Sequence, residues 1–153
     1  MILILHNIRS VYNVGAIFRT ADAAGVSKIY LTGYTPTPLD RFGRERTDVA
    51  KAALGAEKSV AWEHTPELAE LILKLKSESY TIVALEQAEN STDYKNFKAL
   101  EKTALVLGEE RYGITTDILE SCDHVIEIPM RGKKESLNVS VATGIALFRI
   151  LNI

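Results

Sequence analysis

Short, nearly continuous apolar runs alternate with helix-like segments along this chain. Residues 1–5, 81–85 and 103–107 are such runs, and each borders polar residues. They are typical of strands buried on both faces, because a strand with one solvated face alternates apolar and polar residues instead. Helical segments between such strands supply the crossovers that parallel pairing requires. The sequence therefore predicts an α/β fold, a mostly parallel sheet with helices on both faces.

The boundaries of the helices follow from residues with special roles at helix ends. Gly25 and Gly55 are suited to ending helices, and the Thr65-Pro66-Glu67 segment is suited to starting one. Asn13 and Asn138 are expected N-caps, since an asparagine oxygen accepts from free backbone N–H groups. The pattern predicts helices over 14–24, 44–54, 66–78, 116–121 and 139–151, and further strands over 28–31, 59–62 and 124–128.

Composition limits the classes to which the chain can belong. Its 153 residues fit one domain, over residues 1–153, and no apolar run is long enough to span a bilayer. The apolar start lacks the basic leader and cleavage site of a signal peptide. The single cysteine, Cys122, excludes an intramolecular disulfide, and the 3 histidines lie too far apart in sequence for a metal site. We therefore expect a cytoplasmic domain with no metal and no membrane contact.

Charge bears on the kind of partner. The net charge of −2 argues against a protein that coats nucleic acid without specificity. The charges are unevenly distributed, because arginines gather in the first third while Arg131, Lys133 and Lys134 lie together near the end. This distribution allows one basic face on the folded domain, although scattered solvated charges fit the same sequence.

The loops that follow the strands carry the functional evidence, because ligands of open parallel sheets bind beyond the carboxyl ends of the strands. The first loop leads into a helix of small residues that holds Arg19, whose planar fork suits phosphate or carboxylate. A surface arginine with a packed stem fits the same pattern. In a later loop, Ile128, Met130 and Leu137 could form the wall of an apolar pocket.

A loop at residues 107–115 holds two glycines with the spacing of a phosphate-binding P-loop. Ile114 occupies the position of the lysine that a P-loop requires, and no G-x-G occurs in the chain. Nucleotide hydrolysis and dinucleotide binding are therefore disfavoured. Glycines at these positions let backbone groups approach a flat ligand closely. Glu110 could accept hydrogen bonds there, or it could be a solvated turn residue.

Taken together, these loops resemble the motifs of the SpoU (TrmH-like) RNA ribose methyltransferases of the SPOUT superfamily. The resemblance covers nearly the whole chain in the right order and spacing. One departure is Glu109, where the family usually has Asn, Ala or Ser, and it adds negative charge near the RNA side. The matching segments are NVGAIFRTADAAG (13–25), ALGAEKSV (53–60), ALVLGEERYG (104–113) and IPMRGKKESLNVSVATGIALF (128–148).

This resemblance implies a fold and a cofactor. The fold would be an α/β knot, in which the C-terminal third of the chain threads through a loop. The chain has no match to the extra N-terminal RNA-binding domain of many relatives, so we expect a minimal catalytic domain. The family binds S-adenosylmethionine between the knot loops. Here that implies backbone and apolar contacts from Leu85, Leu107, Gly108, Ile128, Met130 and Leu137.

The resemblance also implies methyl transfer to a ribose 2′-hydroxyl of tRNA or rRNA. The family is homodimeric, with the active site where two subunits meet, and the apolar last helix agrees with a partner subunit. Arginine rarely releases its proton, so we expect Arg19 to anchor a phosphate and stabilise oxyanion charge rather than act as a base. The residues that match the family's catalytic and substrate-side positions are Asn13, Arg19, Glu110, Ser136 and Asn138.

The competing interpretation is a non-catalytic RNA-binding or assembly protein that retains the fold. It predicts cofactor binding without turnover, or neither. Transfer of labelled methyl from S-adenosylmethionine to bulk unmodified RNA separates the two interpretations.

Overall fold

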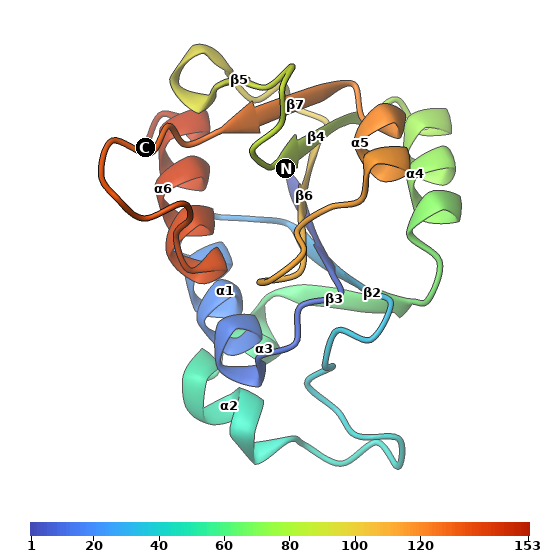
Figure 1. The fold of residues 1–153 in the computed structure, drawn as a ribbon. Coiled ribbons are helices and arrows are strands. Elements are labelled where there is room, and N and C mark those ends of the chain that lie inside the picture. Colours follow the sequence, from blue (N-terminus) through green and yellow to red (C-terminus); the bar gives the residue numbers. More distant parts are fainter.

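A single sheet of seven strands organises the chain, and every strand pairing in it is parallel. The computed structural model describes residues 1–153. The strand order is β3-β2-β1-β6-β4-β7-β5 (Figure 1). The predicted parallel α/β sheet is thus confirmed. The strands are β1 (Ile2–His6), β2 (Lys28–Thr32), β3 (Ala61–Thr65), β4 (Thr81–Leu85), β5 (Thr92–Asp93), β6 (Thr103–Leu107) and β7 (His124–Glu127).

Helices cover both faces of the sheet. Successive side chains of the central strands point to opposite faces, and both sets are apolar, so each face needs a covering layer. Leu3 and Leu5 of β1 belong to one buried cluster, while Ile2 and Ile4 belong to the other. The first cluster packs against four helices and the second against two (Figure 1). These are α1 (Val11–Ala23), α2 (Thr47–Ala53), α3 (Ala56–Ser59) and α6 (Val139–Leu151) on the first face, and α4 (Leu68–Ser77) and α5 (Thr116–Ser121) on the second.

Several predicted boundaries are confirmed and others are wrong. The strands at 81–85 and 103–107 and the helices at 116–121 and 139–151 have the predicted bounds. Asn138 is the N-cap of α6, and its side chain accepts from the backbone N–H of Ser140 at 2.9 Å. A short 3-10 turn, η1 (Tyr94–Asn96), follows β5.

The N-cap predicted at Asn13 is wrong. Helix α1 begins three residues earlier than Val14, and its N-cap is Ser10, whose hydroxyl accepts from the backbone N–H of Asn13 at 3.3 Å. Asn13 itself lies in the first turn, and its side chain is buried. A local capping pattern could not distinguish the two residues, because the side chain of Asn13 has a partner distant in sequence.

The helix start predicted at Thr65 and the elements predicted over 44–54 and 59–62 need similar corrections. Thr65 belongs to β3, where it pairs with Thr32, so α4 begins only at Leu68. Helix α2 begins at Thr47, because Glu45 pairs with Leu39 in an isolated antiparallel bridge. The segment before Ala61 is helical and forms α3, so β3 starts later than predicted.

Three further observations concern the sequence-based expectations. None of the helices combines the length and the hydrophobicity needed to cross a bilayer. No cluster of three or more His, Cys, Asp or Glu side chains could hold a metal ion. Burial raises the pKa of the Cys122 thiol to about 11, which disfavours a nucleophilic thiolate. The threading of the C-terminal third through a loop stays a prediction.

Candidate functional site

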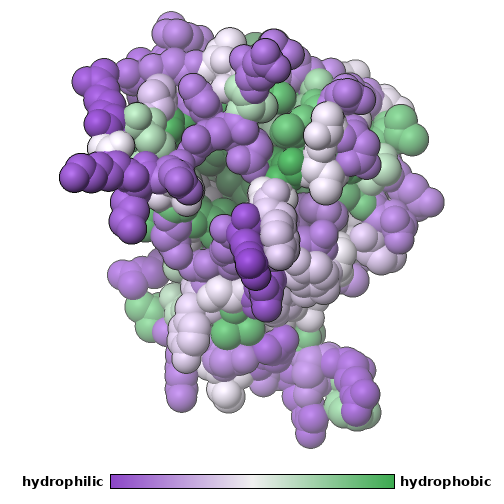
Figure 2. Space-filling view, in the orientation of Figure 1, coloured by the Kyte–Doolittle hydropathy of each residue, from purple (hydrophilic) through white to green (hydrophobic).

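A cavity of about 260 Å³ lies at the carboxyl edge of the sheet. Its lining comes from the ends of β4, β6 and β7, from the loops that follow them and from the start of α6. In Figure 2, hydrophobic surface is recessed behind hydrophilic side chains on the side where the loop between β7 and α6 lies. The cavity therefore occupies the place where parallel sheets bind ligands.

The cavity brings together most of the residues singled out in the sequence. Ser136 and Glu110 line it. Asn13 bonds directly to Glu110, and Asn138 bonds to Asn13. Arg19 is the one predicted site residue that neither lines this cavity nor bonds to its lining. All of the residues expected from the resemblance to contact a cofactor line the cavity, namely Leu85, Leu107, Gly108, Ile128, Met130 and Leu137.

A hydrogen-bonded chain of three side chains joins the three sequence motifs. The Asn13 amide donates to Glu110 Oε1 at 2.8 Å, across 97 residues of sequence. The Asn138 amide donates to Asn13 Oδ1 at 3.1 Å, across 125 residues. Asn13 uses its donor and its acceptor in these two bonds, so its amide orientation is determined. This chain links the loop after β6, the start of α1 and the start of α6.

Glu110 also binds the backbone where α1 begins. Its carboxylate accepts from the N–H groups of Arg9 at 2.9 Å and Ser10 at 3.0 Å. Burial alone would raise the pKa of Glu110, but the hydrogen bonds from Arg9, Asn13 and Ser10 outweigh burial and lower the pKa. Glu110 is therefore an ionised acceptor that positions its neighbours, because its two oxygens already have three donors.

The β6 loop (residues 108–114) forms one wall of the cavity and is held by a residue that the sequence analysis missed. Glu86, directly after β4, accepts from the backbone N–H of Ile114 at 2.9 Å. Gly113 has φ +67°, and a Cβ added there would overlap the Glu86 carboxylate. Gly113 also donates to the Glu109 carbonyl at 2.9 Å and closes a tight turn. The position of Glu86 at a carboxyl strand end was the signal available in the sequence.

The β7 loop (residues 129–137) forms the opposite wall and has few internal contacts. None of its residues takes part in a backbone–backbone hydrogen bond. Its one hydrogen bond to the rest of the chain runs from Gln87 Nε2 to the Glu135 carbonyl at 2.7 Å. The Ser136 hydroxyl has no partner in the chain. The peptide groups of this loop are thus free to bind a ligand.

The cavity lining is strongly acidic. Glu86, Glu109, Glu110 and Glu127 line it, against one cationic residue, Arg111. Glu109, the departure from the family pattern, forms a long ion pair with Arg9 at 3.9 Å. Negative charge around a recessed apolar floor favours a cationic ligand group and disfavours a polyphosphate.

Arg19 lies on α1 outside this cavity. It is exposed, and its guanidinium has no hydrogen bond or ion pair in the chain. Arg19 is six positions after Asn13, which corresponds to an advance of about 9 Å along the helix and a rotation of about 240°. Asn13 and Arg19 therefore point in different directions. The next residue, Thr20, faces α6, with its methyl 3.7 Å from where a Cβ of Gly144 would lie.

Helix α6, which Thr20 faces, exposes a row of large apolar side chains. Val141, Ile145 and Phe148 are 50%, 39% and 40% exposed and lie one helical turn apart. Leu137, just before the helix, is 38% exposed. A contiguous apolar face of this kind usually marks an interaction surface.

Comparison with known proteins places this geometry in a family context. The family model described as SpoU rRNA Methylase family matches residues 1–148. A Staphylococcus saprophyticus protein that carries the name of a TrmH family tRNA/rRNA methyltransferase is 38% identical over 149 residues. The match covers 97% of this chain and 57% of that protein. The chain thus spans little more than half the length of this relative.

Solved structures give the same likeness. The A. aeolicus TrmH/SpoU tRNA modifying enzyme superimposes with a TM-score of 0.84 at 32% identity, over 97% of this chain and 72% of that one. The AdoMet-bound rRNA methyltransferase from Sinorhizobium meliloti superimposes with a TM-score of 0.87 at 28% identity. It covers 99% of this chain and 55% of that chain.

Proposed function

The chain belongs to the SpoU rRNA methylase family, and on that premise we propose that it transfers a methyl group from S-adenosylmethionine to a ribose 2′-hydroxyl of tRNA or rRNA. The observation that carries this proposal is the meeting of the three sequence motifs around one cavity. We further propose that residues 1–153 act as one methyltransferase domain. One continuous sheet with a helical layer on each face supports this.

The cavity fits S-adenosylmethionine in its chemistry. The peptide groups of the β7 loop have no backbone partners, so they are available to the polar edges of an adenine ring. Leu85, Leu107 and Ile128 offer apolar contacts to its faces, and the glutamate-rich lining suits a sulfonium cation. The AdoMet-bound state of the Sinorhizobium meliloti relative agrees with this assignment. The cofactor, when bound, supplies a methyl group activated by the positive sulfur.

The residues of the chain then have to bring the ribose into line and exclude water. In the displacement, a bond forms between the ribose oxygen and the methyl carbon, and the sulfur–carbon bond breaks. The hydroxyl proton passes to an RNA phosphate or to solvent. Arg19 would anchor that phosphate and stabilise negative charge on the ribose oxygen. Asn13 and Asn138 would act as positioning residues through Glu110 and the start of α6.

A second copy of the chain is proposed to complete the site. Arg19 does not line the cavity of its own chain, and the apolar row on α6 is exposed. A two-fold contact through α6 would bury Val141, Ile145 and Phe148 and bring Arg19 near the partner's cavity. The proposed assembly is therefore a homodimer with two composite sites.

The activity is tested by incubating the purified protein with labelled S-adenosylmethionine and bulk unmodified RNA. We expect label in alkali-resistant dinucleotides, the product of ribose methylation. Binding of S-adenosylmethionine without transfer to any tRNA or rRNA would support the non-catalytic alternative. Mapping ribose methylation in cells with and without the protein then identifies the RNA and the nucleotide.

The role of Arg19 is tested with Arg19→Ala at saturating RNA. We expect kcat to fall by about 10²- to 10³-fold while the affinity for S-adenosylmethionine is unchanged. Mixing Arg19→Ala with Met130→Arg, a variant designed to block the cavity, should restore part of the activity. Only a mixed dimer can pair an intact Arg19 with an intact cavity. Near-normal turnover of Arg19→Ala would overturn the role, and failure of the mixture would place Arg19 in its own chain's site.

A further inference from the structure

The segment after β2 forms a small protruding hairpin, the tip hairpin (residues 38–46), outside the cavity. Leu39 and Glu45 pair in an antiparallel bridge, and the Arg46 N–H donates to the Pro38 carbonyl at 2.8 Å. Gly43 supplies the turn with φ +76°. In Figure 1 the segment extends away from the sheet, and Figure 2 shows a small hydrophobic patch among hydrophilic side chains at that corner.

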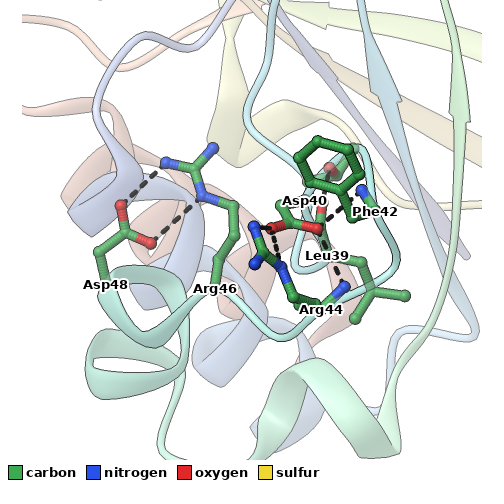
Figure 3. Close-up of polar contacts among 7 residues, drawn as sticks. Leu39, Asp40, Phe42, Arg44, Arg46 and Asp48 are labelled. Carbon is green, nitrogen blue, oxygen red and sulfur yellow. Dashed lines mark hydrogen bonds and ion pairs between the residues drawn. The ribbon is translucent and has the colours of Figure 1, made fainter.

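The Asp40 carboxylate organises the turn of this hairpin. It accepts from the backbone N–H groups of Phe42 at 2.8 Å and Arg44 at 3.0 Å, and from Arg44 Nε at 2.8 Å (Figure 3). Hydrogen bonds from Arg44 lead the effects that lower the pKa of Asp40, so the carboxylate stays ionised. The hairpin is thus preorganised, with a defined backbone that carries Phe42 at its end.

Phe42 presents an exposed ring with two guanidinium groups close to it. Its side chain is 66% exposed. The Arg41 and Arg44 guanidinium carbons lie 4.8 Å and 5.0 Å from its ring centroid. A phenylalanine this exposed contributes little to the core, and the nearby arginines form cation–π contacts with its ring. This arrangement is suited to stacking a flat, electron-rich partner.

The acidic residues of the hairpin region are all paired, which leaves free positive charge. Asp40 pairs with Arg44, and Asp48 pairs with Arg46 at 2.8 Å (Figure 3). Glu45 pairs with a lysine on α3 at 2.8 Å. Arg41 has no anionic partner in the chain. The free charge beside Phe42 is therefore cationic, which complements a phosphate.

The tip hairpin shares an edge of the sheet with the cavity. It follows β2, whose carboxyl end lies at the same edge as that of β6, with only β1 between them. Two strand spacings correspond to about 10 Å. RNA bound along this edge of the sheet (Figure 1) could therefore contact both the cavity and the hairpin.

We propose that the tip hairpin binds an unpaired nucleotide of the RNA substrate, with its base stacked on Phe42 and its phosphate beside Arg41. This inference rests on the proposed function for the identity of the RNA. The tip hairpin would supply a second contact, which selects single-stranded segments near the methylated ribose. Proteins recognise single-stranded RNA by stacking splayed bases on aromatic rings and arginine planes, so the residue types fit.

The test compares Phe42→Ala with Phe42→Tyr, which keeps the stacking face. A matched control is Leu100→Ala, because Leu100 is 62% exposed and lies before β6, at the opposite edge of the sheet. Binding is measured with a fluorescein-labelled dodecamer of uridine, and kcat and KM with bulk unmodified RNA. We expect Phe42→Ala to raise Kd and KM by about 5- to 100-fold, with kcat at saturating RNA unchanged. Phe42→Tyr and Leu100→Ala should behave as the unsubstituted protein.

Arg41→Ala gives an independent measurement. It should lower the slope of log Kd against log salt by about 0.7, the value for one phosphate contact on single-stranded nucleic acid. Methyl transfer with an unchanged KM in Phe42→Ala would overturn the inference and leave the proposed function intact. RNA binding that depends on Phe42, without methyl transfer, would support the inference and overturn the proposed function. Loss of self-association in Phe42→Ala, seen by sedimentation, would show instead that the hairpin contacts a second copy and would overturn the inference.

Discussion

The two walls of the cavity differ in how the chain holds them. The β6 loop is bound by Glu86 at Ile114, by Glu110 at the start of α1 and by its own turn at Gly113. The β7 loop has no backbone–backbone hydrogen bonds and a single side-chain bond from Gln87. One wall is therefore part of the folded scaffold, whereas the other has many unused polar groups.

This difference indicates a division of labour between folding and binding. Contacts that are present in the free protein contribute to its stability, so the β6 loop should open only with much of the fold. The β7 loop can gain its hydrogen bonds from a ligand, and binding then stabilises it by linkage. We therefore expect changes in the β6 loop to affect stability first, and changes around the β7 loop to affect ligand affinity first.

The largest expected effect comes from Gly113→Ala compared with Gly132→Ala. Alanine at φ +67° is strained, and its Cβ would overlap the Glu86 carboxylate that accepts from Ile114. We expect the free energy of unfolding to fall by about 2–4 kcal/mol, measured by urea denaturation. Gly132 has no atom within 4 Å of an added Cβ, so its variant should stay within about 0.5 kcal/mol of the original. Equal effects in both variants would remove the distinction between the walls.

The next effect is expected from Glu110→Gln, which keeps the shape of the side chain. One oxygen becomes an NH₂ group that faces N–H donors from Arg9, Ser10 or Asn13. We expect a loss of about 2 kcal/mol in the free energy of unfolding, since a charged acceptor is lost and a donor is left unpaired. The matched control, Glu135→Gln in the β7 loop, should change stability little, because only its backbone carbonyl accepts a bond. A neutral result for Glu110→Gln would mean that the hydrogen-bonded chain does not stabilise the free protein.

A smaller effect should appear when the stabilities of the unsubstituted protein and Glu110→Gln are compared as a function of pH. The folded state lowers the pKa of Glu110, so its contribution is fully present above the unfolded pKa and is lost as the pH falls through the folded value. We expect the stability difference between the unsubstituted protein and Glu110→Gln to be constant near neutral pH and to shrink below about pH 4.5. Denaturation of both proteins at matched pH values isolates Glu110, because other carboxylates with a lowered pKa, such as Asp123, titrate in both. A difference that grows in acid would contradict this assignment.

The sequence allowed the fold class and most of the cavity wall to be predicted, because these depend on local patterns. Continuous apolar runs at 81–85 and 103–107 gave strands with the predicted bounds. Leu85 and Leu107 end those strands, so the rule that ligands bind at carboxyl ends was sufficient to place them at a cavity. Their contact with a cofactor stays a prediction, since it came from the resemblance.

Long-range polar pairs could not be predicted in the same way. Asn13 looked like a helix cap because its type favours caps, but its side chain bonds to Glu110, 97 residues away. The preorganised hairpin was missed for a related reason. The three hydrogen bonds to the Asp40 carboxylate depend on a turn that local propensity does not determine.

The smallest change in stability, and the sharpest test of the comparison, is expected from Gln87→Ala. The substitution removes the one hydrogen bond that joins the β7 loop to the rest of the chain, from Gln87 Nε2 to the Glu135 carbonyl at 2.7 Å. Gln87 is exposed, so the free energy of unfolding should change by less than about 0.5 kcal/mol. The affinity for S-adenosylmethionine, measured by calorimetry, should nevertheless fall by about 3- to 10-fold, because binding must then order a loop that has lost its anchor. If stability falls and affinity does not, the β7 loop belongs to the scaffold as much as the β6 loop does, and the two walls are alike.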